Sequence, residues 1–229
     1  MIYAANFKTN HTRVSTVRYL NILSEQMSDK DTDDRIFVFP PATALDHFDG
    51  EITIGAQNAY PVRNGAFTGE IGLEQLEEFG IETILIGHSE RRESMKEDQQ
   101  TVADKYQFFM EQGFEIIYCI GEPLKVREAG EAAVKAYLLA QFEGIDLSYE
   151  KTIVAYEPIW AIGTGRSATS EEIASTHAML KSQMNRPLLY GGSVKLENIK
   201  EITAIDGVDG VLVGSASLDA ENFAQMILA

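Results

Sequence analysis

The sequence predicts a closed (β/α)8 barrel, an α/β fold in which eight parallel strands are surrounded by outer helices. Short apolar runs alternate with charged, amphipathic segments along the whole chain. Most of these runs are continuously apolar, which is typical of strands that are buried on both faces. Dividing 229 residues by eight gives about 29 residues per unit, a normal size for a strand with its crossover helix. We therefore expect residues 1–229 to form one domain.

An open, doubly wound sheet is the alternative fold. A GxGxxG motif after the first strand would favour it, and the sequence has none there.

In chain order, the apolar runs predict strands at Ile2–Ala5, Arg35–Phe39, Ile52–Ala56, Thr83–Ile86, Glu115–Cys119, Thr152–Tyr156, Leu188–Tyr190 and Gly210–Val213.

Helical periodicity predicts the segments between the strands. In chain order these helices are Val14–Met27, Thr101–Gln112, Glu128–Phe142, Ser170–Gln183 and Asn222–Leu228. Ser170 followed by Glu171 and Glu172 is typical of a helix start, with an N-cap residue and acidic side chains in the first turn.

The composition restricts the possible partners and the compartment. The formal net charge is −16, so we expect no nucleic-acid binding, which needs a basic face. An anionic small substrate stays possible, because backbone amides and one lysine can outweigh a distant negative field. We expect a cytoplasmic chain without membrane contact: Cys119 is the single cysteine, and the sequence shows no signal peptide or long apolar run.

Candidate catalytic residues follow three of the predicted strands. In such barrels the chemistry lies at the carboxyl ends of the strands. Asn6 and Lys8 follow the first strand, His88 the fourth and Glu157 the sixth, and glycine-rich turns follow the seventh and eighth. A lysine, a histidine and a glutamate beside such turns indicate an electrophile, an acid and a base around an anion site. Each residue alone has a structural alternative, as a surface charge or a hydrogen-bonded histidine, and their convergence favours function.

Other motifs give no site. His11, His47 and His177 show no metal-ligand spacing, so we expect no metal. The run Gly163–Arg166 lacks the Lys-Ser/Thr ending of a phosphate-binding P-loop. The segment Pro158–Arg166 joins a stiff Pro-Ile-Trp start to a Gly-Thr-Gly end, which predicts a lid over Glu157.

Eight segments spread over nearly the whole chain carry a family resemblance: Asn6–Asn10, Gly55–Asn58, Gly65–Glu70, Ile86–Arg92, Cys119–Glu122, Ala155–Gly165, Tyr190–Val194 and Asp209–Leu218. They closely resemble the triosephosphate isomerase family, whose members are TIM barrels. The resemblance implies the interconversion of dihydroxyacetone phosphate and D-glyceraldehyde 3-phosphate through an enediolate, a step of glycolysis and gluconeogenesis, without a cofactor.

The resemblance also implies a role for each site residue. Glu157 would be the base, its basicity raised by the exclusion of water. His88 would polarise the carbonyl as a neutral imidazole, its pKa lowered by the helix start at Ser89. Lys8 would stabilise negative charge. The other implied residues are Asn6 as a substrate hydrogen-bond donor, the amides of Gly163, Ser193, Gly214 and Ser215 around the phosphate, Glu90 as a buried carboxylate near the lysine, Glu97 as a supporting acid, and the lid contacts Tyr190–Ala168 and Ser193–Gly163.

The resemblance further implies a homodimer, in which Gln57–Glu70 reaches the partner and Thr68 approaches the partner's site. The chain departs from the family pattern at Ser215, where glycine is usual, and in a shortened stretch from Ser170 to Arg186. Two other functions stay open. Another sugar-phosphate enzyme such as an aldolase would need a Schiff-base lysine inside a central strand, and a non-catalytic descendant would lack one of Lys8, His88 and Glu157.

Overall fold

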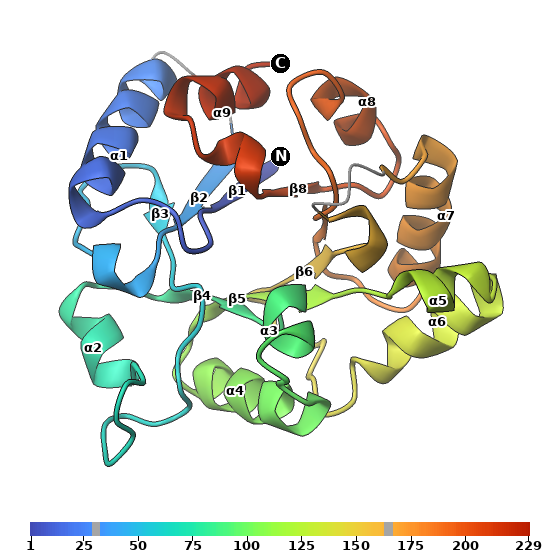
Figure 1. Ribbon diagram of the computed structural model, residues 1–229, viewed down its shortest axis with the longest axis horizontal. Coiled ribbons are helices and arrows are strands. Elements are labelled where there is room, and N and C mark those ends of the chain that lie inside the picture. The colour runs from blue at the N-terminus through green and yellow to red at the C-terminus, as the bar shows by residue number, and fades with distance from the viewer. Residues whose placement is uncertain (29–32, 163–166) are drawn as a thin grey trace.

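The computed structural model describes residues 1–28, 33–162 and 167–229 (Figure 1). Its strands form one parallel sheet in the order β3-β2-β1-β8-β7-β6-β5-β4. The strands are β1 (Ile2–Asn6), β2 (Arg35–Phe39), β3 (Thr53–Ile54), β4 (Thr83–Ile86), β5 (Glu115–Ile120), β6 (Thr152–Tyr156), β7 (Leu188–Tyr190) and β8 (Gly210–Val213). The predicted eight-stranded barrel is confirmed.

The barrel closes between β3 and β4 through a single parallel bridge from Ala56 to Ile84. The Ala56 amide donates to the Thr83 carbonyl at 2.8 Å, and the Leu85 amide donates to the Ala56 carbonyl at 2.9 Å. The regular part of β3 is shorter than the predicted strand, because only two of its residues pair in register with β2. The barrel is therefore nearly closed, with a narrow seam at this position.

A separate apolar cluster fills the inside of the barrel. It alternates along the strands with the residues that pack against the helices, as strand geometry requires. Its members are Ile2, Ala4, Phe37, Phe39, Leu85, Ile117, Cys119, Ile153, Ala155, Leu189 and Leu212. The interior is therefore a packed core, and the open end of the barrel is left for chemistry.

Helices surround the strands (Figure 1). The α-helices are α1 (Arg13–Met27), α2 (Leu73–Glu78), α3 (Ser89–Glu93), α4 (Gln99–Glu111), α5 (Leu124–Glu128), α6 (Glu131–Ala140), α7 (Ser170–Lys181), α8 (Ile199–Thr203) and α9 (Ala220–Ile227), and the 3₁₀ turns are η1 (Ala42–Ala44), η2 (Ile159–Ala161) and η3 (Ser215–Ser217). The short helices α2 and α8 escaped prediction, because five or six residues carry too little periodicity to identify a helix.

Two helix predictions are corrected by the structure. The predicted helix Glu128–Phe142 begins too early: α6 starts at Glu131, and Gly130, with a φ of 98°, separates it from α5, of which only the last residue lies in the predicted range. The N-cap of α7 is Thr169 rather than Ser170. The Thr169 hydroxyl accepts from the Glu172 amide at 3.2 Å, and the Glu172 carboxylate accepts from the Thr169 amide at 2.9 Å, which forms a capping box.

In the ranges that the structure describes, no helix combines the length and apolar character needed to cross a bilayer.

Candidate active site

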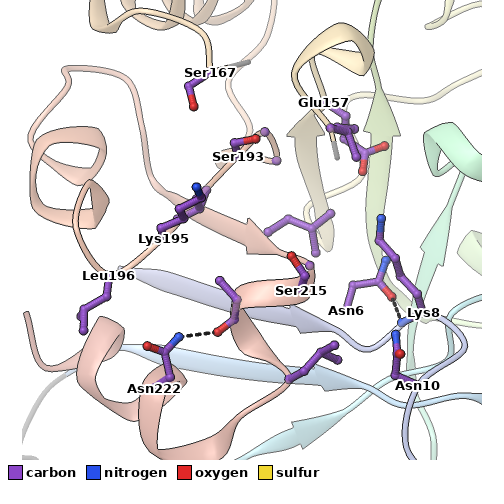
Figure 2. Close-up of a pocket in the computed structure, with 18 of the residues that line it drawn as sticks. Asn6, Lys8, Asn10, Glu157, Ser167, Ser193, Lys195, Leu196, Ser215 and Asn222 are labelled. Atoms are coloured by element: carbon purple, nitrogen blue, oxygen red, sulfur yellow. Dashed lines mark hydrogen bonds between the residues drawn. The ribbon is translucent and has the colours of Figure 1, made fainter. Parts of the chain in front are cut away.

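A cavity of about 590 Å³ opens at the carboxyl ends of the strands (Figure 2). In Figure 2, Asn6, Lys8 and Glu157 lie on one side of it, and Ser193 and Lys195 lie on the other. The predicted site residues that line it are Asn6, Lys8, His88, Glu157, Ser193, Gly214 and Ser215. Residues from five strand ends therefore meet at one cavity, as the sequence predicted. Gly163 lies outside the described residues, as does the end of the predicted lid.

Two glycines make room for Glu157 between neighbouring strand ends. The Glu157 amide donates to the Ile120 carbonyl at 2.7 Å. A Cβ at Gly121 would lie 1.9 Å from the Glu157 carbonyl oxygen, and one at Gly191 would lie 3.0 Å from the Glu157 Cγ. A side chain at Gly121 or Gly191 would therefore collide with Glu157, and only 2% of Glu157 is exposed.

Both oxygens of Glu157 are hydrogen-bonded. His88 Nε2 lies 2.9 Å from Oε1, and the Ser89 amide donates to Oε2 at 2.9 Å. Burial alone would raise the pKa of Glu157, but His88 and the Ser89 amide outweigh it and hold the pKa below its usual range. The expected rise in basicity is thus absent while these two bonds are made.

His88 is the N-cap of α3, which confirms the helix start predicted at Ser89. Its Nδ1 accepts from the Glu90 amide at 3.2 Å. Because an accepting nitrogen carries no proton, the ring is neutral and Nε2 donates to Glu157. Burial lowers the pKa of His88, but the Glu157 carboxylate raises it, and the net direction is upward. The prediction of a lowered pKa was therefore wrong for this arrangement, and the amide of Glu90 selects the tautomer.

Lys8 has a left-handed backbone with a φ of 52°, which is uncommon for a residue with a Cβ. Its amide donates to the Asn6 side chain at 3.0 Å, and its carbonyl accepts from the Gln57 side chain at 2.8 Å. The ammonium group contacts the Glu90 carboxylate at 2.5 Å. Glu90 is thus next to the lysine as predicted, but its side chain is 49% exposed in the single chain rather than buried.

The opposite side of the cavity is lined by Ser193, Gly214 and Ser215. Ser215 begins the turn η3 and is exposed. Among the described residues, a positive φ outside glycine occurs at Lys8, His11 and Lys96. Ser215 therefore adopts its position without the backbone strain that would require glycine. The Ser193 hydroxyl donates to the Ala161 carbonyl at 2.5 Å, which ties this side to the start of the lid.

Comparisons with known proteins agree with this geometry. The family model described as triosephosphate isomerase matches residues 1–229. The chain belongs to the triosephosphate isomerase family. It is 72% identical over 229 residues to the triosephosphate isomerase of Sulfurovum sp. (strain NBC37-1), with all of both chains covered. It is 59% identical to that of Wolinella succinogenes and 56% identical to that of a Nitratiruptor species, with 99% of this chain covered in each case and 99% and 97% of the relatives.

In this member of the triosephosphate isomerase family, the first part of the predicted lid is bonded to Glu122, which sequence reasoning did not single out. Its Oε1 accepts from Trp160 Nε1 and Arg127 Nε at 2.9 Å and from the Tyr156 hydroxyl at 3.0 Å. The residue is fully buried. A glutamate two residues after a buried strand was the available signal, because a buried carboxylate must find a cation or several donors. The sequence could not show that Arg127 is that cation.

Ala168 lies two residues beyond the predicted lid. Burial raises the pKa of the Tyr190 hydroxyl, and the Ala168 backbone partly opposes this rise, as a neighbouring hydrogen-bonding group does; these two residues are the predicted Tyr190–Ala168 pair. The second predicted pair, Ser193 with Gly163, involves a residue outside the described ranges. Gln57 is a further positioning residue that the sequence did not single out, since its side chain also donates to the Phe39 carbonyl at 2.8 Å and so ties β2 to Lys8.

Glu97 lies away from the cavity, as expected for a supporting acid of this family. Its Oε1 accepts from Arg91 Nε at 2.6 Å and from Lys105 Nζ at 2.5 Å. Burial raises its pKa, but Arg91 and Lys105 bring the net value below its usual range. Lys105 also donates to the Asn58 side chain at 2.7 Å, so this network connects α4 to the loop after β3. In the described part of the chain, no three His, Cys, Asp or Glu side chains are grouped so that they could hold a metal ion.

Proposed function

We propose that this chain interconverts dihydroxyacetone phosphate and D-glyceraldehyde 3-phosphate by proton transfer through an enediolate. The observation that carries the proposal is the meeting of Lys8, His88 and Glu157 in one cavity at the carboxyl ends of the strands. The names of its relatives, which share up to 72% of their residues with it, support the same reaction.

Glu157 is the proposed base. Its two oxygens are engaged by His88 and the Ser89 amide, so it must give up at least one of these bonds to reach a substrate carbon. That exchange also removes the contacts that lower its pKa, and burial then raises the pKa toward the range of an effective base. The same movement thus delivers the carboxylate and activates it.

His88 is the proposed electrophile. Because Nδ1 accepts from the Glu90 amide, the Nε2 proton is available for a substrate carbonyl oxygen once Glu157 moves. Nε2 can then pass its proton to one enediolate oxygen and take the proton of the other. Lys8 supplies positive charge next to the developing oxyanion, where low dielectric strengthens the interaction, and Asn6 donates a hydrogen bond to the substrate.

The phosphate is proposed to bind the amides of Gly163, Ser193, Gly214 and Ser215. Small residues suit this role, because backbone N–H groups must approach the dianion closely. The lid would exclude water and prevent the enediolate from eliminating phosphate. Support for the lid comes from its anchored start at Glu122 and from the Tyr190–Ala168 contact.

We also propose a homodimer formed through Gln57–Glu70. A cavity of about 430 Å³ beside Lys8 is lined by Gln57, Glu90 and Met95 and could accept a partner's loop tip with Thr68. Met95 and Phe67 are large apolar side chains that are 64% and 41% exposed in the single chain. Their burial in a partner would be favourable. Sedimentation at micromolar concentration tests this, and an active monomer of 25.4 kDa would exclude it.

The remaining expectations belong to the same proposal. Residues 1–229 would act as one catalytic domain in the cytoplasm, in glycolysis and gluconeogenesis, without a cofactor. The single cysteine, Cys119, is buried inside the barrel, which suits a reducing compartment.

A coupled assay of glyceraldehyde 3-phosphate turnover by the purified chain tests the proposed reaction. The wild type should turn over rapidly, and Lys8→Met should abolish detectable turnover while leaving the circular dichroism spectrum intact. Lys200→Met is the matched control, because Lys200 is exposed on α8. A folded wild type without turnover, or an active Lys8→Met variant, would refute the proposed reaction or the proposed role of Lys8, respectively.

A further inference from the structure

Three consecutive backbone carbonyls at the end of η3 each accept a hydrogen bond from a side chain. Figure 2 shows the first of these bonds, from Asn222. The three bonds are Asn222 Nδ2 to Ala216 at 2.6 Å, the Tyr19 hydroxyl to Ser217 at 2.7 Å, and His11 Nε2 to Leu218 at 3.0 Å. Two of the three donors, His11 and Tyr19, belong to the part of the chain that follows β1: His11 lies in the loop and Tyr19 on α1.

His11 makes its bond from an unfavourable backbone. Its φ is 68°, in the left-handed region where glycine or asparagine is more easily accommodated. A carbonyl oxygen can only accept, so Nε2 carries a proton, and Nδ1 lies 3.2 Å from the Ser15 hydroxyl. The ring also packs on Phe7, with 4.5 Å between ring centroids. These contacts hold a conformation that the backbone alone disfavours.

The two segments that His11 connects both line the cavity. Lys8 lies three residues before His11, and the turn between them is closed by the Asn10 amide, which donates to the Phe7 carbonyl at 3.1 Å. Gly214 and Ser215 lie directly before the three carbonyls. A Cβ at Gly214 would lie 3.4 Å from the Lys8 Cε, so the Lys8 side chain lies close to Gly214 at the cavity itself.

We propose that His11 and Tyr19 are positioning residues that fix η3 to the Lys8 segment, so that the ammonium group and the η3 amides face one phosphate dianion. This inference rests on the proposed function, because it assigns a phosphate ester to this part of the cavity. The bonds join His11, in the loop after β1, and Tyr19, on α1, to η3 within the chain itself. They therefore reduce the ordering that phosphate binding would otherwise require.

The test measures binding of inorganic phosphate by calorimetry and turnover of glyceraldehyde 3-phosphate, well below the melting temperature. His11→Asn tolerates the left-handed backbone but is too short to reach Leu218. We expect its phosphate Kd and its KM to rise about five- to tenfold, the effect of losing about one hydrogen bond, with kcat within about twofold of wild type. His11→Gln, whose longer amide can donate to Leu218, should recover part of the affinity.

Tyr19→Phe provides a second variant with an unchanged backbone, because it removes only the hydroxyl that donates to Ser217. The same rise in Kd and KM is expected from it, also if His11→Asn fails to fold. His47→Asn is the matched control: His47 is exposed beside Asp49 and lines a different cavity with Arg35 and Thr53, so it should leave phosphate binding unchanged.

The outcomes separate the two proposals. Unchanged phosphate Kd and KM in both His11→Asn and Tyr19→Phe, beside an active wild type, would overturn the positioning role and leave the proposed function intact. A lowered melting temperature with unchanged phosphate affinity would likewise assign these residues to stability alone. A folded wild type that neither binds phosphate nor turns over would overturn both proposals.

Discussion

Two buried histidines of this barrel show opposite electrostatics. His88 and His177 are 6% and 0% exposed, and burial lowers the pKa of each. His88 faces the Glu157 carboxylate, and its net pKa is raised. His177 packs beside the rings of Tyr156 and Tyr190, its Nδ1 lies 3.0 Å from the Gly207 carbonyl, and its pKa falls to about 4. The difference shows that a neighbouring carboxylate counteracts the effect of burial on the pKa of a histidine.

The largest expected effect comes from removing that carboxylate. Glu157→Gln should lower kcat about 10³-fold, the usual contribution of a general base. It should also make His88 resemble His177, with a pKa below 6.5, because burial, the largest influence, is then opposed only by the weaker effect of the Glu90 carboxylate. The coupled assay and an NMR titration of the histidine rings measure both effects. Glu197→Gln, exposed at the edge of the same cavity, is the control. A His88 pKa that stays high would contradict the comparison.

Glu122 is a second buried carboxylate, and it tests whether burial alone or position in the cavity makes Glu157 the proposed base. Glu122 pairs with the permanent cation of Arg127 rather than with a histidine. Glu122→Gln leaves that cation without its partner and should lower the free energy of unfolding by about 3 kcal/mol. Urea denaturation measures the loss, with the exposed Glu78→Gln as the control. If Glu122→Gln abolished turnover without loss of stability, the two carboxylates would not have the separate roles that their partners indicate.

The pH dependence of the free energy of unfolding reports on the buried, neutral state of His177. Its folded pKa, about 4, lies below the ordinary 6.5, so the unfolded chain binds the proton first as the pH falls. The stability that a neutral His177 contributes is complete above pH 6.5 and is lost toward pH 4. Between pH 8 and pH 5 the loss should be about 2 kcal/mol.

His177→Asn should remove this part of the pH dependence, whatever its stability at pH 8, and its kcat should stay within about twofold of wild type. Urea denaturation of both proteins at the two pH values gives the difference. Equal losses in wild type and variant would show that His177 is not buried in its neutral form.

The smallest effect is expected at Ser215. Because its backbone is outside the left-handed region, Ser215→Gly removes a side chain without relieving strain. The KM for glyceraldehyde 3-phosphate should change by less than about twofold. A tenfold improvement in KM would instead mean that the serine Cβ obstructs the phosphate, and that this side of the cavity is more restrictive than its geometry indicates.

The sequence predicted the strands better than the helices, for physical reasons. Strands β2, β4, β6, β7 and β8 have the predicted bounds, because a parallel strand buried on both faces is a continuous apolar run that ends where the burial ends. The break at Gly130 was missed, because Ala129 and the alanine-rich sequence after Gly130 continue the helical pattern, and only the backbone angle shows the interruption.

At the candidate site, residue types and order were predictable, and their partners were not. Lys8, His88 and Glu157 follow buried strands, so the fold brings them together. The pairing of Glu157 with His88 and the Ser89 amide depends on side-chain direction across two strand ends, which one-dimensional spacing does not contain. For the same reason the directions of their pKa shifts, and the exposure of Glu90, needed the structure.

The seam between β3 and β4 determines how this barrel can come apart. Elsewhere neighbouring strands are joined by a ladder of backbone hydrogen bonds, whereas here the isolated bridge consists of the two hydrogen bonds that Ala56 makes with Thr83 and Leu85. Local opening should therefore begin at the seam, and the amide hydrogens of Ala56 and Leu85 should exchange with solvent before those of β5 and β6. The bond from Lys105 to Asn58 reinforces the closure from outside the sheet. In the folding of the chain, the ring of strands would then be completed last at this position, after the longer ladders have formed.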